Sequence, residues 1–183
     1  GQPPRRKDGA PASPRMGAGT GPFDSYESRS AGERCIMSFG RNAGPPMFAN
    51  GFYNNNYQIV QNKDYVMLMG EMVHDARIIR LDKEHLPGTG KTWLGDSVGH
   101  WEGDTLVVDT IGTNGRSRPI NGYFANSVNA TPESLKVPRL PASEQLHLIE
   151  RFRVVGKGKV LEVVKQVIDP KTYKNTFANT VYM

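Results

Sequence analysis

Apolar and polar residues alternate along residues 57–183, which is the pattern of β-strands with one buried face. The alternating segments are rich in aromatic and β-branched residues, and short polar turns separate most of them. No segment has a convincing apolar repeat at the helical spacing of 3.6 residues. The pattern therefore predicts about eight strands, at residues 57–61, 65–73, 76–81, 93–101, 105–110, 145–155, 160–168 and 175–183.

Two of the predicted connections are tight enough to form hairpins. Residues 62–64 join the first two strands, and residues 102–104 join the fourth strand to the fifth. The second of these turns contains Gly103, a residue type that tight turns use where φ is positive. Successive strands joined by short turns pair antiparallel. We therefore expect an all-β fold, an antiparallel up-and-down meander that forms a barrel or a strongly curved sheet.

The predicted strand at residues 145–155 places a carboxylate among apolar side chains. Side chains alternate between the two faces of a strand, so Glu150 shares a face with Leu148. A carboxylate on a buried face needs an arginine or several hydrogen-bond donors, or it stays protonated. Arg77 and Arg80, in the strand at residues 76–81, are the candidate partners.

The chain divides into three parts by composition. Residues 1–22 read as an extended, basic, Gly/Pro-rich arm, residues 23–56 as an irregular, turn-rich segment, and residues 57–183 as a β-domain with one long loop at residues 111–143. Fixing an extended arm costs roughly 1 kcal/mol per residue, and this arm has little apolar surface of its own to bury. Long loops in compact domains are usually functional or partner-bound. We therefore expect both segments to bind protein partners or further copies of the chain.

Length and composition exclude several classes of protein. The 183 residues allow one domain with extensions, and 20 Gly with 13 Pro mean that part of the chain lies outside a packed core. The net charge is +5, and residues 1–22 hold four basic residues against Asp8. Basic residues are not interleaved with stacking aromatics, so nucleic-acid binding is not expected. No apolar run reaches the roughly 18 residues of a membrane-spanning helix, so we expect a soluble or peripheral protein.

The cysteine content and the start of the chain bear on the compartment. Cys35 is the only cysteine, which excludes an internal disulfide framework and a CxxC metal or haem motif. We expect a buried, inert thiol there, with an intermolecular disulfide as the alternative. The chain starts at Gly1 without an initiator Met or a hydrophobic leader, as after removal of a signal peptide or after trimming.

One long motif resembles a known group of proteins. The run GHWEGDTLVVDT at residues 99–110, preceded by TWLGDS at residues 92–97, is similar to a signature of a large group of predicted secreted proteins from environmental bacteria that has no assigned activity. The likeness also includes NNYQIVQ, EMVHDARII and LHLIERFRVV, and extends over roughly residues 34–183. It implies an export signal and a β-rich, lipocalin-like body, and it supplies no catalytic residues. An insertion around residues 120–141 and the basic arm depart from the group.

Polar residues on the predicted strands give one candidate catalytic set. His74, Arg77, His100 and Glu150 lie on otherwise apolar strands, where a histidine could act as a general base and an arginine could stabilise an oxyanion. His74 and His100 could also meet across adjacent strands. The alternative is a buried ion-pair network that fixes the register of the sheet, and it is favoured because no catalytic motif accompanies the set. We expect no metal and no cofactor.

Two other features have structural interpretations. The segment PGTGKT at residues 87–92 resembles the end of a phosphate-binding P-loop, but His85 stands where the first glycine should be, so a surface turn is expected. The large aromatic residues of the strands are expected to be core or barrel-lining residues rather than a carbohydrate platform: Tyr57, Tyr65, Trp93 and Trp101.

These observations together predict an interaction protein. The preferred function is that of a non-catalytic structural or interaction subunit of an extracytoplasmic assembly, which grips its neighbours through residues 1–22 and residues 111–143. The first alternative is a small secreted lyase, hydrolase or isomerase with the His/Arg site named above. The second is a lipocalin-like carrier of an apolar ligand.

Overall fold

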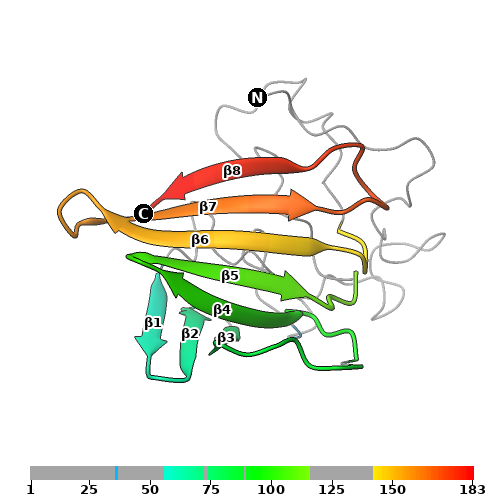
Figure 1. Ribbon diagram of the computed structural model, residues 1–183, viewed down its shortest axis with the longest axis horizontal. Coiled ribbons are helices and arrows are strands. Elements are labelled where there is room, and N and C mark those ends of the chain that lie inside the picture. Colours follow the sequence, from blue (N-terminus) through cyan, green and yellow to red (C-terminus); the bar gives the residue numbers. More distant parts are fainter. Residues whose placement is uncertain (1–35, 37–55, 72–73, 89, 116–141) are drawn as a thin grey trace, which may run out of the picture.

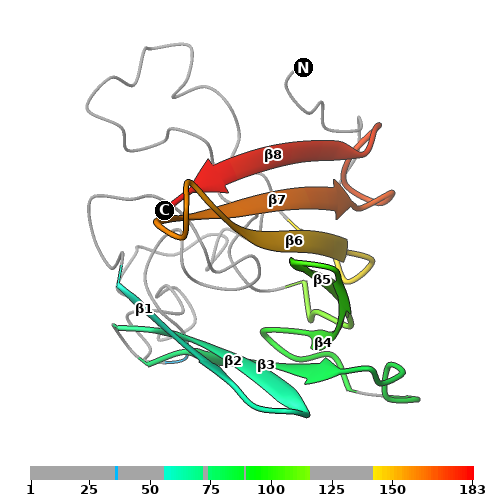
Figure 2. The ribbon, with the colours of Figure 1, turned by 60° about the vertical axis from the view of Figure 1, so that its left-hand side comes forward.

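The computed structural model describes residues 36, 56–71, 74–88, 90–115 and 142–183 (Figure 1). One eight-stranded sheet contains all the strands in chain order, and it curls into a half-barrel (Figure 2). The expected all-β meander with strong curvature is confirmed. Residues 1–22 and 116–141, on which the predictions of partner binding depend, lie outside the described residues. The strands are β1 (Tyr57–Gln61), β2 (Tyr65–Gly70), β3 (Ala76–Leu81), β4 (Asp96–Glu102), β5 (Thr105–Ile111), β6 (His147–Val155), β7 (Val160–Ile168) and β8 (Phe177–Tyr182).

One pair of neighbouring strands is parallel, so the expectation of a wholly antiparallel sheet is wrong at this point. β3 and β4 run in the same direction over three residue pairs, from Ile79 opposite Ser97 to Leu81 opposite Gly99. The cause is the connection at residues 82–95, which is long enough to carry the chain back before β4 begins. The remaining six pairs of neighbouring strands are antiparallel.

Two strands are shorter than their sequence pattern. β2 ends at Gly70 instead of continuing to residue 73, because the Gly70 N–H donates to the Asp75 carbonyl (3.1 Å) and closes the turn into β3. β4 begins at Asp96 instead of Trp93. Trp93 packs with Leu94 in a small apolar group at the end of the β3–β4 connection.

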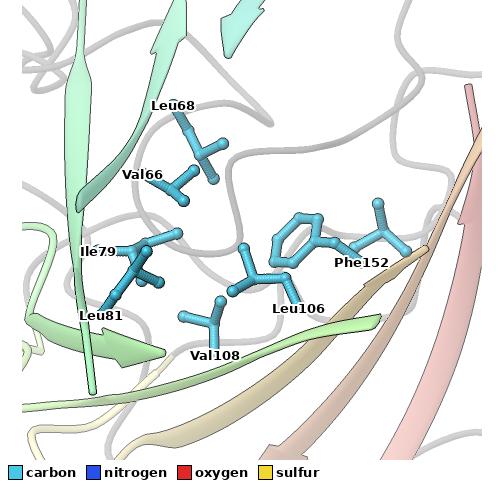
Figure 3. Close-up of a cluster of buried hydrophobic side chains, with 8 residues drawn as sticks. Val66, Leu68, Ile79, Leu81, Leu106, Val108 and Phe152 are labelled. Atoms are coloured by element: carbon cyan, nitrogen blue, oxygen red, sulfur yellow. The ribbon is translucent and has the colours of Figure 1, made fainter. Parts of the chain in front are cut away.

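The main apolar core lies on the inner face of the curl. Side chains from β2 and β3 meet side chains from β5, β6 and β7 across the concave side (Figure 3). Tyr57 packs against this core, but Tyr65 and Trp101 are exposed, so their expected place in the core or barrel lining is wrong. The buried members of the core are Val66, Leu68, Ile79, Leu81, Leu106, Val108, Phe152 and Val163.

Two glycines before and after β4 offer a matched test of how backbone conformation and space contribute to stability. Gly95 and Gly103 both have positive φ (73° and 59°). A Cβ at Gly95 would lie 2.6 Å from the Ile111 carbonyl oxygen, whereas a Cβ at Gly103 meets nothing within 4 Å. We expect Gly103→Ala to lower the free energy of unfolding by about 1 kcal/mol and Gly95→Ala to lower it by about 2 kcal/mol. Urea denaturation of both variants measures the difference, and equal losses would contradict the packing argument.

Candidate functional site

A row of polar side chains crosses the inner face of the sheet, next to the apolar core. Arg77 on β3 donates from Nε to the Ser97 hydroxyl (2.9 Å) and from Nη2 to the Thr110 hydroxyl (2.6 Å). Its Nη1 lies 2.6 Å from Oε2 of Glu150 on β6. These two atoms are close enough for an ion pair, although they are not aligned as a hydrogen bond. The arginine thus links strands β3, β4, β5 and β6.

The members of this row are removed from solvent. Arg77 and Glu150 are 1% and 0% exposed, and both hydroxyl partners are buried. Isolated charges are very costly to bury, and a close opposite charge with additional hydrogen bonds is what makes such burial tolerable. The Ser97 and Thr110 hydroxyls also lie 2.9 Å from each other. The arrangement therefore holds the register of four strands together from the inside.

A lysine continues the row on β7. Lys165 lies directly opposite Glu150 in the β6–β7 register and is 1% exposed. Burial lowers the pKa of the Lys165 ammonium from 10.5 to about 8; the Glu150 charge acts in the opposite direction, and the Arg77 charge adds to the lowering. Lys165 therefore remains mostly charged at neutral pH but loses its proton at a much lower pH than an exposed lysine does.

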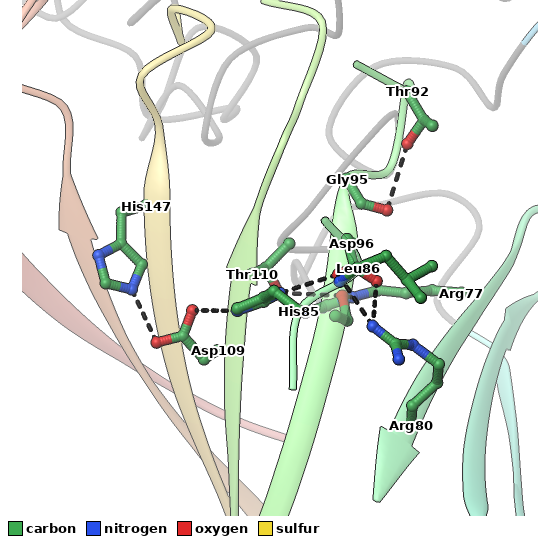
Figure 4. Close-up of polar contacts among 11 residues, drawn as sticks. Arg77, Arg80, His85, Leu86, Thr92, Gly95, Asp96, Asp109, Thr110 and His147 are labelled. Carbon is green, nitrogen blue, oxygen red and sulfur yellow. Dashed lines mark hydrogen bonds and ion pairs between the residues drawn. The ribbon is translucent and has the colours of Figure 1, made fainter. Parts of the chain in front are cut away.

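A second polar network lies on the outer face of the sheet (Figure 4). His85, in the β3–β4 connection, places Nδ1 2.9 Å from Asp96 of β4 and Nε2 3.1 Å from Asp109 of β5. The other oxygen of Asp109 lies 2.8 Å from Nε2 of His147 on β6, and Arg80 of β3 donates to both oxygens of Asp96 (2.9 and 3.0 Å). Charged or ionisable groups from four strands and one loop thus form a continuous chain.

His85 joins two carboxylates of neighbouring strands through its two ring nitrogens. The ring belongs to the β3–β4 connection, whereas Asp96 and Asp109 lie on β4 and β5. These two contacts fix the β3–β4 connection to the outside of the sheet.

Asp96 is the centre of this outer network. Burial raises the pKa of its carboxyl, but hydrogen bonds from His85, from the Leu86 N–H (3.0 Å) and from Arg80 outweigh this and bring the pKa below its ordinary value. A carboxyl with a lowered pKa in the folded state contributes stability above its unfolded pKa, and the contribution is lost as the pH falls through the folded pKa.

Removing Asp96 should therefore loosen the connection. We expect Asp96→Ala to lower the free energy of unfolding by about 2 kcal/mol, because Arg80 and His85 both lose a partner that is largely buried. Amide exchange at Leu86 should become at least about tenfold faster, since its N–H loses the Asp96 acceptor. Glu84→Ala, at an exposed position in the same connection, is the control and should change neither quantity; unchanged exchange at Leu86 in Asp96→Ala would contradict the assignment.

The four residues of the predicted catalytic set do not come together. Arg77 and Glu150 form the expected buried pair, and Arg77 rather than Arg80 is the partner of Glu150. His74 is exposed in the turn before β3 and has positive φ, and His100 is exposed beside Glu102. The parallel register sets Leu81 opposite Gly99, so the two histidines lie roughly 20 Å apart along the strand direction. The expectation that they meet across adjacent strands is wrong.

The sequence pattern did not identify several members of these networks, and three of them show which signals were available. Lys165 lies on the inward-facing side of β7, and its alternation with Val163 and Val167 was a usable signal. The outward position of Asp109, on the opposite face from Thr110, was readable in the same way. The contacts of His85 with Asp96 and Asp109 could not be predicted, because they depend on the path of a connection that has no regular repeat.

The networks contain histidines and carboxylates, which are residue types that can bind a metal ion. Among the described residues, no group of three or more His, Cys, Asp or Glu side chains is arranged to hold a metal ion. Likewise, no helix in this part of the chain is long and apolar enough to cross a bilayer. A comparison with protein families, curated proteins and solved structures finds no match for this chain.

Proposed function

We propose that the chain is a non-catalytic interaction subunit of an extracytoplasmic assembly, and that the half-barrel binds its neighbours through the edges of its open sheet. β1 and β8 are the two ends of the strand order, and no pairing between them closes the described strands into a barrel. Each end strand presents one row of backbone N–H and C=O groups away from the sheet. Such rows are binding sites for an added strand.

The observation that carries the proposal is the chemistry of these edges. Proteins that must avoid association protect an edge strand with Lys, Pro, a bulge or an inward-pointing charge. β1 and β8 contain no charged residue, no proline and no glycine, and each keeps an unbroken register with its one neighbour. Unprotected edges at both ends of a sheet favour an interaction role.

The polar networks support a structural role. Arg77 and Glu150 are buried against each other, and the Asp96–His85–Asp109 contacts hold a connection to the sheet. In each network, ionisable side chains of opposite charge type contact one another. A catalytic function would need a reacting group that is both activated and accessible. The candidate residues combine these properties poorly, since His74 and His100 are accessible but distant from the buried pair.

The proposal includes the segments that the sequence analysis assigned to partner binding. Residues 1–22 and the long loop at residues 111–143 are proposed to add contacts with protein partners or with further copies of the chain. The extracytoplasmic location rests on the resemblance to secreted bacterial proteins.

The test is the mass of the purified chain in solution as a function of concentration. We expect light scattering to give a mass above that of the monomer, and a variant with a lysine on both edges, Ile59→Lys with Thr180→Lys, to be monomeric because the charges block strand addition. Circular dichroism should be the same for both proteins. A wild-type chain that remains monomeric at all concentrations, and that copurifies with no partner from its native source, would contradict the proposal.

A further inference from the structure

The free edge of β1 has a defined set of outward-facing backbone groups. The Asn62 N–H donates to the Tyr65 carbonyl (2.9 Å), and the Glu71 N–H donates to the Asn56 carbonyl (3.0 Å). In an antiparallel pair, hydrogen-bonded and non-hydrogen-bonded positions alternate. The even-numbered residues of β1 therefore bond to β2, and the odd-numbered ones, including Ile59 and Gln61, direct their N–H and C=O groups away from the sheet.

The outward N–H and C=O groups of Ile59 and Gln61 have no other partner in the part of the chain that the structure describes. The residues from Gln58 to Gln61 make no hydrogen bond beyond the ladder with β2. The side chains are equally open: Ile59 is 48% exposed, and Val60, which points to the opposite face, is exposed as well. An uncharged strand that exposes both its backbone edge and its apolar side chains is prone to take up another strand.

We infer that β1 pairs antiparallel with β1 of a second copy of this chain, about a two-fold axis that passes through Ile59. This inference rests on the proposed interaction function and identifies the partner of the β1 edge as another copy of the chain. In this register Ile59 lies opposite Ile59 of the second copy, and Tyr57 lies opposite Gln61. At the axis, the outward N–H and C=O groups of Ile59 bond with those of Ile59 in the second copy. The two half-barrels then share one continuous sheet.

The side chains fit this self-pairing. Two Ile59 side chains bury each other on one face, and on the other face Gln58 lies opposite Val60. Val60 also begins an apolar row that continues across β2 and β3 through Met67 and Ile78. Pairing at β1 brings the two rows of a dimer next to each other, with the Val60 side chains of the two copies as diagonal neighbours, and no like charges face each other across the junction.

Other occupants of the β1 edge fit less well. Pairing with β8 of a second copy is heterologous and gives open chains unless the rotation closes a ring, whereas β1 with β1 gives a closed dimer. The arm at residues 1–22 contains Pro3, Pro4, Pro11 and Pro14. Proline lacks an N–H and is a poor member of a ladder. A second copy of β1 is therefore the occupant that the geometry favours.

The first test is a cross-link at the proposed two-fold axis. Directly opposed residues of a hydrogen-bonded antiparallel pair have Cα atoms about 5.5 Å apart, which lies within the range of a disulfide. In a full-length chain with Cys35→Ser, we expect Ile59→Cys to form a covalent dimer under mild oxidation. Thr180→Cys, at an exposed position on β8, is the control and should remain uncross-linked. Cross-linking at Thr180 instead of Ile59 would overturn the inference.

The second test uses matched lysine variants of the full chain. Ile59 and Ile78 have nearly equal exposure (48% and 47%), but Ile78 lies on β3 inside the sheet. Sedimentation should show that Ile59→Lys raises the dimer Kd by on the order of 100-fold, because two ammonium groups face each other at the axis. Ile78→Lys should change it less than about threefold.

A proline variant checks the backbone argument. Ile59→Pro removes an N–H that β2 does not use, so it should abolish the dimer while the melting temperature changes little. If the wild-type chain assembles and both Ile59→Lys and Ile59→Pro leave the assembly intact, the inference is wrong while the interaction function stands. If the wild-type chain does not associate at all, both are wrong.

Discussion

Replacing Glu150 with leucine is expected to lower the free energy of unfolding by about 3–5 kcal/mol, the cost of leaving a buried charge without its partner. Arg77 is 1% exposed, and its guanidinium would keep only the two hydroxyl acceptors of Ser97 and Thr110. Lys165, opposite Glu150 on β7, would lose the same countercharge. Guanidinium denaturation followed by circular dichroism measures the loss.

Two further variants separate this ion-pair effect from a simple change of volume. Arg77→Met combined with Glu150→Leu removes both charges, and we expect it to recover at least half of the lost stability, because the Ser97 and Thr110 hydroxyls still bond to each other (2.9 Å). Glu102→Gln breaks only exposed ion pairs and should cost less than about 1 kcal/mol. A loss below 1 kcal/mol in Glu150→Leu would show that the buried pair contributes little.

The pair at the centre of this prediction was accessible from the sequence alone. Strict alternation in residues 145–155 sets Glu150 on the buried face, and the cost of an unpaired buried carboxylate then requires a cation nearby. The strand order of a meander restricts where that cation can be. What alternation could not decide was which arginine points inward, since this depends on the exact start of β3: Arg77 lies on the inner face and Arg80 on the outer face.

Features that depend on irregular connections were not predictable. The connection at residues 82–95 returns the chain to the end of the sheet where β3 begins, so β3 and β4 are parallel, and no local pattern signals such a return. The same connection carries His85 to Asp96 and Asp109 on the outer face. The mistaken meeting of His74 with His100 has the same origin, because an antiparallel β3–β4 pair was assumed. Long-range geometry, rather than residue type, decided these contacts.

The stability of the protein should increase as the pH rises from about 8 to about 10.5, through the contribution of Lys165. Burial is the main cause that lowers the pKa of Lys165 from its ordinary value of 10.5 to about 8 in the folded protein. Between these values the unfolded chain binds a proton that the folded chain does not, so stability rises with pH across this window. The full change corresponds to about 3 kcal/mol; below pH 8 the lysine is charged in both states and its contribution is constant.

The contribution of Lys165 can be isolated by difference, because other groups titrate in the same range. We expect the free energy of unfolding of the wild-type chain, minus that of Lys165→Met, to increase by about 2–3 kcal/mol between pH 7.5 and pH 10. Lys63→Met replaces an exposed lysine paired with Asp64, and the same difference should stay flat. A difference that instead decreases with pH would contradict this prediction. It would mean that the Lys165 pKa is raised above 10.5 in the folded protein, because attraction to the Glu150 charge outweighs the effect of burial.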